Sequence, residues 1–423
     1  SYISVKDLTF NSKWHNIKSA GTEVARESWE GRDRLVSFMG RFNYSYKDKY
    51  LFTVTGRADG SSKLAQGHKW GFFPSAAIAW RVTEEGFLKD NSVINNLKLR
   101  LSYGESGNNA VDNYSTILGT SSTQYDFDGT NANGQYLNRI KNDKLGWEKS
   151  KEINLGLDFA LWGGRLAGNV ELYNKKTYDL ILSQKIPQTN GFDNVGAVNV
   201  GATRNKGLEI GLNTVNIQTK DFSWTTNLSF ATNKNEITEI FGDSKDYPDQ
   251  KLFIGQPVLV HYDYAWDGIW QTSEKDEASK YGRLPGAVKE VDQDNSGTIT
   301  PDKDRVILGT PFPDWTGSIT NTFTYKDFDF SVFIYTRQGE MKWSKFHTEL
   351  QNEYLGEINQ LKVDYWTPEN PSNTFYRPGF NGGNTSLLCY KKTSFVRVGN
   401  MTLGYNMPLK WLKNCHISRM SLY

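Results

Sequence analysis

The sequence predicts an all-β fold, a transmembrane antiparallel β-barrel with long extracellular loops. The first observation is compositional, because aromatic residues make up 14% of the chain and glycine occurs 38 times, whereas hydrophobic residues reach only 37%. The second is a repeated alternation of apolar and polar residues over about ten positions, the length that a tilted strand needs to cross a bilayer. The third is that short and long connections alternate between these strands, as in outer-membrane barrels.

Bulk properties exclude several other classes of protein. The 49 basic and 47 acidic residues give a net charge of +2, which argues against a protein that binds nucleic acid through bulk charge. No run of about 18 apolar residues exists, so the sequence encodes no transmembrane helix. Cys389 and Cys415 are too few for a disulfide scaffold, and we expect isolated thiols.

The clearest strands form a hairpin over residues 36–46 and 50–58. They place Phe38, Phe52 and Val54 on one face and Arg41 and Thr55 on the other, around a tight turn at residues 47–49. Further hairpins are predicted for 153–161 with 166–172, for 208–212 with 224–230 and for 319–325 with 328–334, and single strands for 74–82, 97–103, 395–405 and 417 to the end. The count is roughly thirteen strands.

The connections between these strands are strongly unequal in length. One set consists of a few residues, whereas the other covers about 60–72, 105–148, 181–204, 235–313 and 338–393. Outer-membrane barrels have short periplasmic turns and longer extracellular loops, so we assign the long set to the outside. A soluble sandwich would be expected to have shorter loops at both ends.

Charged residues in the middle of the strands share the phase of the polar positions. We predict that they face the lumen of the barrel: Arg41, Arg57, Asp59, Arg81, Arg100, Glu152, Asp158 and Glu209. For Arg57 and Asp59, a contact with the solute path competes with an ordinary ion pair inside a water-filled wall, and the pair is favoured. The alternative for the whole pattern is two soluble β-sandwich domains with the apolar face in a core.

One stretch, DQDNSGTITPDKD at residues 292–304, is similar to a calcium-binding loop. Asp292, Asp294 and Ser296 occupy the first, third and fifth positions, and Gly297 and Thr298 follow at the turn and at the carbonyl position. The twelfth position should be a carboxylate but is a lysine, flanked by two acidic residues, Asp302 and Asp304. The loop therefore either binds a hard divalent cation such as Ca²⁺ or forms an Asx-turn loop without metal.

Aromatic residues cluster in two of the long loops. Flat rings of this kind stack on sugar rings or peptide side chains, and the alternative is that they pack the loops together or against a covering partner. The residues predicted to contact solute or a lid are Tyr262, Tyr264, Trp266, Trp270, Trp343, Phe346 and Trp366.

The sequence carries no enzymatic signature that we recognise. It lacks the Gly-x-Ser-x-Gly elbow, the phosphate-binding loop and the His-Glu-x-x-His zinc motif, and its five histidines are scattered. We therefore expect no catalytic residues.

Seven stretches of the sequence occur in the order found in one known family. They are GRFNYSYKDKYLFTVTGRADGSS (40–62), WGFFPSAAIAWRVTEEGFL (70–88), LKLRLSYGESGNN (97–109), NVGATRNKGLEIGL (199–212), FSWTTNLSFATNKNEI (222–237), DRVILGTPFPDWTGSITNTFTYKDFDFSVFI (304–334) and TSFVRVGNMTLGYNMP (393–408). Together they cover most of the chain. The sequence thus resembles the SusC/RagA-type TonB-dependent transporters of the bacterial outer membrane.

The resemblance implies a plugged barrel of about 22 strands. Residues 1–423 are then expected to be part of a single transmembrane barrel domain, its later part, with the signal peptide, N-terminal extension, plug and final strands outside this sequence. The family further implies a SusD-like surface lipoprotein over the extracellular mouth and TonB acting through the plug from the periplasm.

The function expected from this resemblance is TonB-dependent import of a bulky nutrient, an oligosaccharide or a peptide. Two alternatives remain: a structural or secretion-associated outer-membrane barrel, and a soluble carbohydrate-binding β-sandwich protein. The substrate itself cannot be chosen, because loop aromatics serve glycans and peptides alike.

Overall fold

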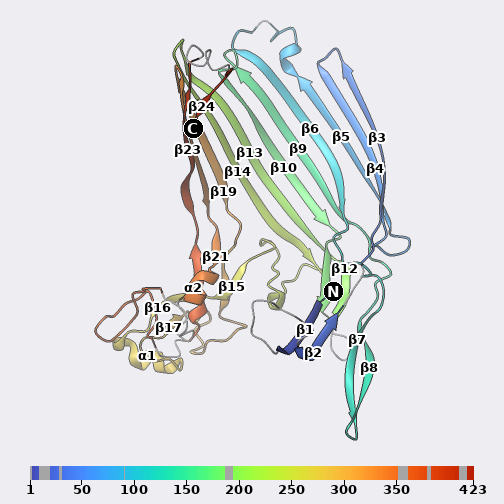
Figure 1. Cartoon of the computed structure of the whole chain (residues 1–423), viewed down its shortest axis with the longest axis vertical. Coiled ribbons are helices and arrows are strands. Elements are labelled where there is room, and N and C mark those ends of the chain that lie inside the picture. The colour runs from blue at the N-terminus through green and yellow to red at the C-terminus, as the bar shows by residue number, and fades with distance from the viewer. Residues whose placement is uncertain are drawn as a thin grey trace.

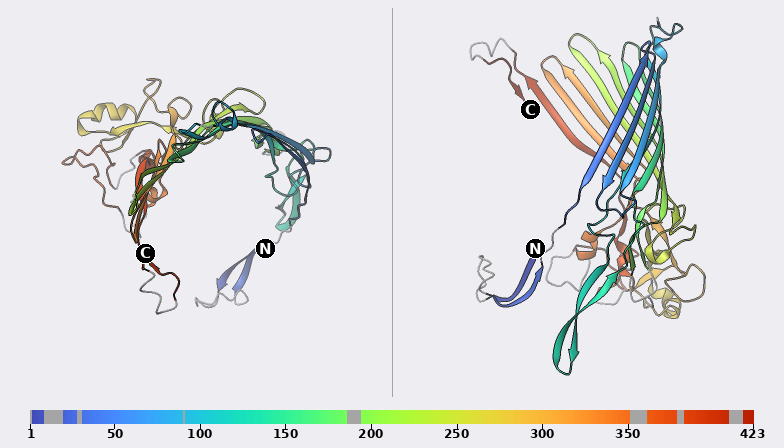
Figure 2. Two further views of the ribbon diagram at one scale, coloured as in Figure 1. Left: turned by 90° about the horizontal axis from the view of Figure 1, so that it is seen from above. Right: turned by 90° about the vertical axis from the view of Figure 1, so that its right-hand side faces the viewer.

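A computed structural model describes residues 2–8, 20–27, 31–89, 91–185, 194–350, 361–378, 383–408 and 417–423. Its main feature is one antiparallel sheet of twelve strands in the order β24-β23-β20-β19-β14-β13-β10-β9-β6-β5-β4-β3. Figure 1 shows the strands running side by side and tilted, and Figure 2 shows the sheet from above as an open arc. The twelve strands are β3 (Leu35–Tyr46), β4 (Tyr50–Ser61), β5 (Trp70–Arg81), β6 (Ile94–Asn108), β9 (Glu148–Leu161), β10 (Leu166–Tyr178), β13 (Gly201–Gln218), β14 (Phe222–Ile240), β19 (Trp315–Tyr325), β20 (Phe328–Gln338), β23 (Phe395–Asn406) and β24 (Ser421–Leu422).

The remaining elements belong to the connections and the ends of the chain. Six two-stranded sheets are formed by β1 (Tyr2–Leu8) with β2 (Ala20–Glu27), β7 (Gly119–Phe127) with β8 (Thr130–Arg139), β11 (Ile181–Lys185) with β12 (Asn194–Asn199), β15 (His261–Tyr264) with β18 (Arg305–Gly309), β16 (Trp266–Ile269) with β17 (Val288–Glu290), and β21 (Met341–Trp343) with β22 (Tyr390–Lys392). The described residues also contain two short α-helices, α1 (Lys275–Lys280) and α2 (Lys345–Leu350), and four short 3₁₀ turns at Val82–Glu84, Pro248–Gln250, Thr272–Glu274 and Thr385–Cys389.

The predicted hairpins are confirmed. In the first, Tyr46 lies opposite Tyr50, and the turn residues Lys47 and Asp48 both have a φ of +53°. Two successive residues at positive φ are typical of the tight turns that match the twist of paired strands. The strand expected from residue 417 onward is shorter than predicted, since β24 covers only two residues.

The tilted strands gather their long connections at one end of the sheet and their short turns at the other, as Figure 1 shows. The connections of residues 109–147 and 241–314 and the described part of 339–394 lie at the lower end in that view, while those of 47–49 and 162–165 lie at the upper end. This agrees with the alternation expected from the sequence. Among the helices that the structure describes, none has both the length and the apolar character needed to span a bilayer.

Register sorts the side chains onto two faces, because directly opposed residues of antiparallel strands point to the same side. The pairings of β3 through β13 place all eight charged residues named above on one face, which we call the polar face. The opposite, apolar face is exposed, with Phe38 at 65%, Phe42 at 61% and Leu403 at 64%. Within the described residues no second sheet covers it, as expected for a barrel wall whose apolar face meets lipid.

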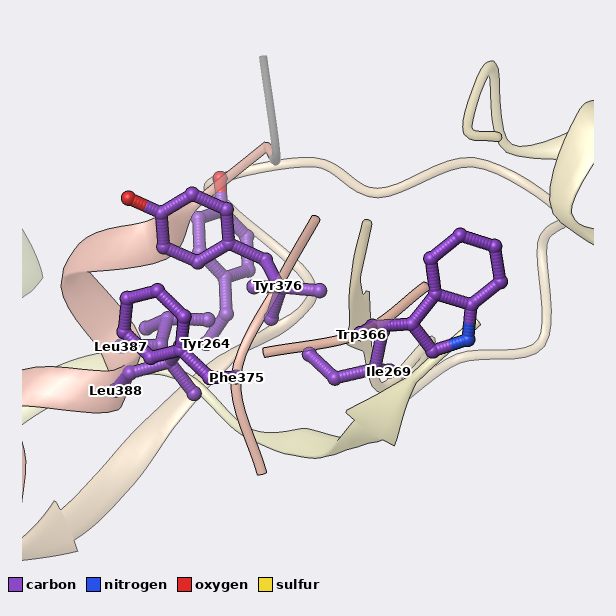
Figure 3. Packing of buried hydrophobic residues seen from close by; sticks show 8 residues of the cluster. Tyr264, Ile269, Trp366, Phe375, Tyr376, Leu387 and Leu388 are labelled. Atoms are coloured by element: carbon purple, nitrogen blue, oxygen red, sulfur yellow. The ribbon is translucent and has the colours of Figure 1, made fainter. Parts of the chain in front are cut away.

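Buried cores lie in the connections and not between layers of the sheet. The largest consists of Tyr264, Ile269, Val288, Trp366, Phe375, Tyr376, Leu387 and Leu388, most of which are drawn in Figure 3. A second, with Leu64, Ala65, Phe73, Val111, Leu145 and Trp147, packs connections against the loop end of β5. The folded mass of the loops therefore has its own hydrophobic stabilisation.

Candidate functional site

The middle of the polar face carries a charged network centred on Arg100 of β6. Its guanidinium donates two hydrogen bonds of 2.8 Å to the carboxylate of Asp158 on β9 and a third to Glu171 on β10. The ammonium of Lys98 lies 3.9 Å from Asp158. A bidentate guanidinium–carboxylate pair is strong and directional, so this network fixes the register of three neighbouring strands.

An open depression of about 540 Å³ lies beside this network. Glu152, Glu171 and Glu209 contribute three carboxyl groups to it, and only Arg100 among its lining residues is basic. The lining is Arg100, Ser102, Glu152, Asn154, Asn169, Glu171, Tyr173 and Glu209. This part of the wall is therefore polar and acidic, and it can accept hydrogen bonds from hydroxyl or ammonium groups.

The other predicted lumen residues have simpler surroundings. Arg57 Nε lies 2.8 Å from both carboxylate oxygens of Asp59, and its Nη2 is 3.2 Å from Ser37 Oγ. Arg41 Nε donates to Thr55 Oγ1 at 3.2 Å, and Arg81 lies exposed where β5 ends. Arg57 and Asp59 thus form an ion pair, which is the alternative that the sequence favoured. That all eight residues line a lumen stays a prediction.

Two long connections fold together into one body, which we call the loop module. It consists of residues 241–314 and of the described part of the second connection, residues 339–350, 361–378 and 383–394. The indole Nε1 of Trp366 donates to Gln271 Oε1 at 3.0 Å, and the backbone N of Ile269 donates to Asn373 Oδ1 at 2.7 Å. Gly286 permits the close packing, since its φ is +92° and a Cβ there would lie 2.7 Å from the Trp366 ring. The two connections are thereby locked to each other, as Figure 3 illustrates.

Buried polar contacts add to this lock. Arg283 Nη2 lies 2.6 Å from Glu290, whose side chain is only 1% exposed, and Asn384 Nδ2 donates to the same carboxylate at 2.9 Å. The phenol of Tyr390 donates to Asp263 Oδ2 at 3.0 Å. Burial, with the neighbouring negative charge of Asp263, raises the pKa of Tyr390, so this phenol stays protonated.

The position of the predicted loop aromatics requires a correction. Tyr264, Trp270 and Trp366 are 8%, 3% and 2% exposed, so these rings form the core of the loop module and cannot meet a solute on its surface. The sequence contained the apolar clusters but not the fold that buries them. Tyr262 and Trp266 are half-buried, whereas Trp343 and Phe346 are exposed at 42% and 57%.

The acidic loop folds on the surface of the loop module. Oxygens from Asp292, Asp294 and Asp304 lie within 4.8 Å of one another. Asp304 is fully buried and accepts hydrogen bonds from the backbone N of Gln293 and of Thr300, 2.8 and 2.7 Å away. The spacing fits a hard cation with oxygen ligands, for which the metal–oxygen distance is about 2.3–2.6 Å for Ca²⁺.

The ligand set differs from the predicted one in its last members. Asp302 is exposed and lies outside the group of three carboxylates, so Asp304 takes the closing position. The hydroxyl of Ser296 donates to the carbonyl of Thr298 at 3.1 Å. Burial raises the pKa of Asp292, but hydrogen bonds from the backbone N–H groups of Gly297 and Ser296 outweigh it, so that pKa is lowered overall. Calcium binding itself stays a prediction.

Comparison with known protein families shows to which family the chain belongs. The profile of the family described as TonB dependent receptor-like, beta-barrel matches residues 7–422. The chain belongs to this family. It is accordingly a chain of the bacterial outer-membrane β-barrel class, so the alternative of a soluble sandwich is wrong, and the resemblance to SusC/RagA-type transporters is confirmed.

Curated relatives of this TonB-dependent receptor chain support the assignment. TonB-dependent receptor P26 of Formosa agariphila is 36% identical over 398 residues, covering 89% of this chain and 39% of that protein. TonB-dependent receptor SusC of Bacteroides thetaiotaomicron is 33% identical over 395 residues, covering 90% and 38%. The chain thus spans about two fifths of the length of these relatives.

Solved structures show the same fold. The structure of the RagAB peptide transporter matches with a TM-score of 0.73 at 24% identity, over 89% of this chain and 41% of that one. The RagAB peptide importer in its open-open state matches with a TM-score of 0.78 at 22% identity, over 93% and 42%. The open arc of twelve strands is about half of a 22-stranded barrel.

Proposed function

We propose that this chain forms part of the wall and outer loops of an importer that takes up a bulky nutrient, an oligosaccharide or a peptide, across the outer membrane. The observation that carries the proposal is the match of residues 7–422 to the TonB-dependent receptor barrel family. Residues 1–423 would belong to a single transmembrane domain, with TonB supplying energy through a plug domain of the whole receptor.

The polar face is the proposed solute wall. Its acidic depression beside Arg100 offers carboxylates at Glu152 and Glu209 for which no side-chain partner is found in the described part of the chain. Carboxylates accept hydrogen bonds from sugar hydroxyls and from peptide N–H groups. The proposal contains no catalytic step, because the sequence has no catalytic signature.

The proposed partner of the loop module is a SusD-like surface lipoprotein. Trp343 and Phe346, in β21 and α2, are exposed aromatic side chains at the outer end of the protein. Exposed aromatic rings on a body held together by hydrogen bonds and a buried core are typical anchors of a protein interface. A structural or secretion-associated barrel would need neither a lid nor a nutrient.

Uptake by cells that carry the full-length receptor tests the import proposal. A strain lacking the receptor should fail to grow on one class of nutrient, oligosaccharides or peptides, and the wild-type gene should restore growth only while TonB is active. Equal growth of the two strains on every nutrient would contradict import. The variant Glu152→Gln with Glu209→Gln should slow uptake, whereas Arg81→Gln, also on the polar face, should not.

Co-purification tests the lid. The lipoprotein should be recovered with the wild-type receptor and lost with the Trp343→Ala, Phe346→Ala variant. Leu284→Ala is the matched control, since Leu284 is a 47% exposed apolar residue of the same loop module. Loss of the lipoprotein in the control as well would assign the effect to damage of the module and not to a docking anchor.

A further inference from the structure

A charged surface lies on the apolar face of the sheet, where that face ends toward the long loops. Leu155, Leu172 and Leu208 lie opposite one another across β9, β10 and β13. Two residues further along each strand, on the same face, the next row consists of Ile153, Asn174 and Lys206. Six basic residues occupy the rows beyond, which we call the basic patch: Lys149, Lys151, Lys176, Arg204, Lys206 and Lys234.

The register brings like charges of the basic patch directly opposite each other. Lys151 faces Lys176, Lys176 faces Arg204, and Lys206 faces Lys234. Opposed side chains of an antiparallel pair have Cβ atoms about 4.5–5.5 Å apart, and like charges at this distance repel. Three such pairs on three consecutive strand interfaces make the bare surface electrostatically unfavourable.

The protein supplies only part of the neutralising charge. Glu105, Glu236 and Glu239 are the acidic residues in the same rows, so six positive charges face three negative ones. Glu105 lies 3.6 Å from Lys151 and Glu236 lies 3.9 Å from Lys234. These two contacts are long ion pairs at an exposed surface, where screening by water and salt weakens them.

Three lysines of the basic patch have no anionic partner in the described part of the chain: Lys149, Lys176 and Lys206. Lys176 and Lys206 are exposed, and their neighbour Arg204 is held by a 2.9 Å hydrogen bond from its Nε to Asn174 Oδ1. The patch therefore presents free ammonium groups at the border of a surface that otherwise faces lipid.

The patch is local and not a feature of the whole rim. On β3 and β5 the loop end of the same face carries Phe38, Trp70 and Phe72, with the Phe38 and Trp70 rings stacked 6.0 Å apart. An aromatic border of that kind is the usual boundary of an outer-membrane barrel. On β9, β10, β13 and β14 basic residues take its place, with one aromatic residue among them, Tyr178, whose ring centroid lies 4.9 Å from Lys151 Nζ.

We propose that the basic patch binds the phosphate groups of lipids with net negative charge in the outer leaflet. The long connections mark this end of the sheet as extracellular, so the patch sits at headgroup level just outside the hydrocarbon that the leucine row contacts. Phosphate oxygens placed between opposed lysines remove the repulsion and accept their hydrogen bonds. The inference rests on the barrel fold and is independent of which nutrient passes through it.

The test uses the full-length receptor in nanodiscs of phosphatidylcholine, whose headgroup has no net charge because its choline cation balances the phosphate. Doubly phosphorylated lipid A or its dephosphorylated form is added as the probe. Wild-type receptor should melt at a higher temperature with the phosphorylated form only. The variant K176Q/R204Q/K206Q should bind the phosphorylated probe at least roughly tenfold more weakly. In phosphatidylcholine alone it should be at least as stable as wild type, because the repulsion between opposed lysines is gone.

The matched control is K47Q/K175Q/K326Q, which removes three positive charges from the polar face and from the short turns at the other end. This control should bind the phosphorylated probe like wild type. Equal binding of the phosphorylated probe by K176Q/R204Q/K206Q and wild type would overturn the proposal. An equal rise in melting temperature with the dephosphorylated form would also overturn it. So would a variant K176Q/R204Q/K206Q that binds the lipid probe normally but no longer binds an acidic partner protein.

Discussion

Trp366 and Gln271, 95 residues apart in the sequence, are joined by a 3.0 Å hydrogen bond from the indole Nε1 to the amide Oε1. The ring itself is 2% exposed and packs within the largest core of the protein. This contact joins the connection that follows β14 to the one that follows β20. These two connections are therefore one folded body and not two independent segments.

The first prediction concerns this core. Trp366→Ala removes a fully buried ring and should destabilise the loop module by about 3–5 kcal/mol. Trp366→Phe retains most of the packing but leaves Gln271 Oε1 without its donor, at a cost of about 1–3 kcal/mol. Hydrogen exchange of the module in the full-length receptor measures both. Trp343→Ala, at an exposed ring, should leave exchange unchanged; equal effects at the two positions would contradict the burial of Trp366.

The second prediction concerns the wall. Arg100→Ala leaves Asp158 and Glu171 side by side without their shared cation, so the sheet should lose about 1–3 kcal/mol of stability. The thermal midpoint of the receptor in detergent is the readout. Arg81→Ala is the control on the same face. If both variants melt alike, the Arg100 network does not hold the strands together.

The third prediction concerns the acidic loop. If it binds Ca²⁺, a chelator should lower the melting temperature of the loop module in wild type, and Asp292→Asn or Asp304→Asn should weaken calcium affinity by roughly tenfold. Asp302→Asn should bind like wild type because that carboxylate lies outside the group. Identical melting with chelator and with added calcium would leave the Asx-turn loop as the correct description.

The fourth prediction concerns acid stability. A 2.7 Å bond from Lys289 and a backbone hydrogen bond from Gln271 lower the pKa of Glu274 below its usual value of 4.5. Because the pKa of Glu274 is lower in the folded protein than in the unfolded chain, its charge stabilises the loop module fully at pH values above the pKa of the unfolded chain. This contribution is lost as the pH falls through the pKa that Glu274 has in the folded protein. Glu274→Gln should therefore be less stable than wild type at pH 7, and the difference should shrink below about pH 4.5.

Glu277→Gln is the control for this titration, since Glu277 is exposed on α1 and forms an ion pair with the exposed Lys280. It should reduce the stability at pH 7 by less than Glu274→Gln does. A difference between wild type and Glu274→Gln that stays constant from pH 7 down to pH 3 would show that the carboxylate charge is not what stabilises this turn.

Much of the sheet could be predicted from the sequence, because its strands obey a period of two. Phe38, Arg41 and Phe42 were assigned to faces by alternation alone, and the register agrees. The strand tally of roughly thirteen came close to the twelve found. Alternation also places Lys151 and Lys176 in phase with Leu155 and Leu172, but that these lysines face each other depends on the register between strands, which the sequence does not show.

The loops could not be predicted in this way. Burial of Tyr264, Trp270 and Trp366 depends on contacts between segments about a hundred residues apart, and composition cannot distinguish a buried ring from one exposed to solute. The acidic loop shows the same limit. Its first carboxylates follow from spacing, but the choice of Asp304 over Asp302 depends on which side chain turns inward.

The most direct test of the central claim, that one face of this sheet meets lipid and the other water, is a cysteine scan along residues 152–158 of β9. Each variant of the full-length receptor in vesicles would carry a fluorescent label, quenched in turn from the lipid phase and from the aqueous phase. Labels at Ile153, Leu155 and Leu157 should be quenched from lipid, and those at Glu152, Asn154 and Asp158 from water. Quenching without this two-residue alternation would contradict the barrel wall and the import function proposed from it.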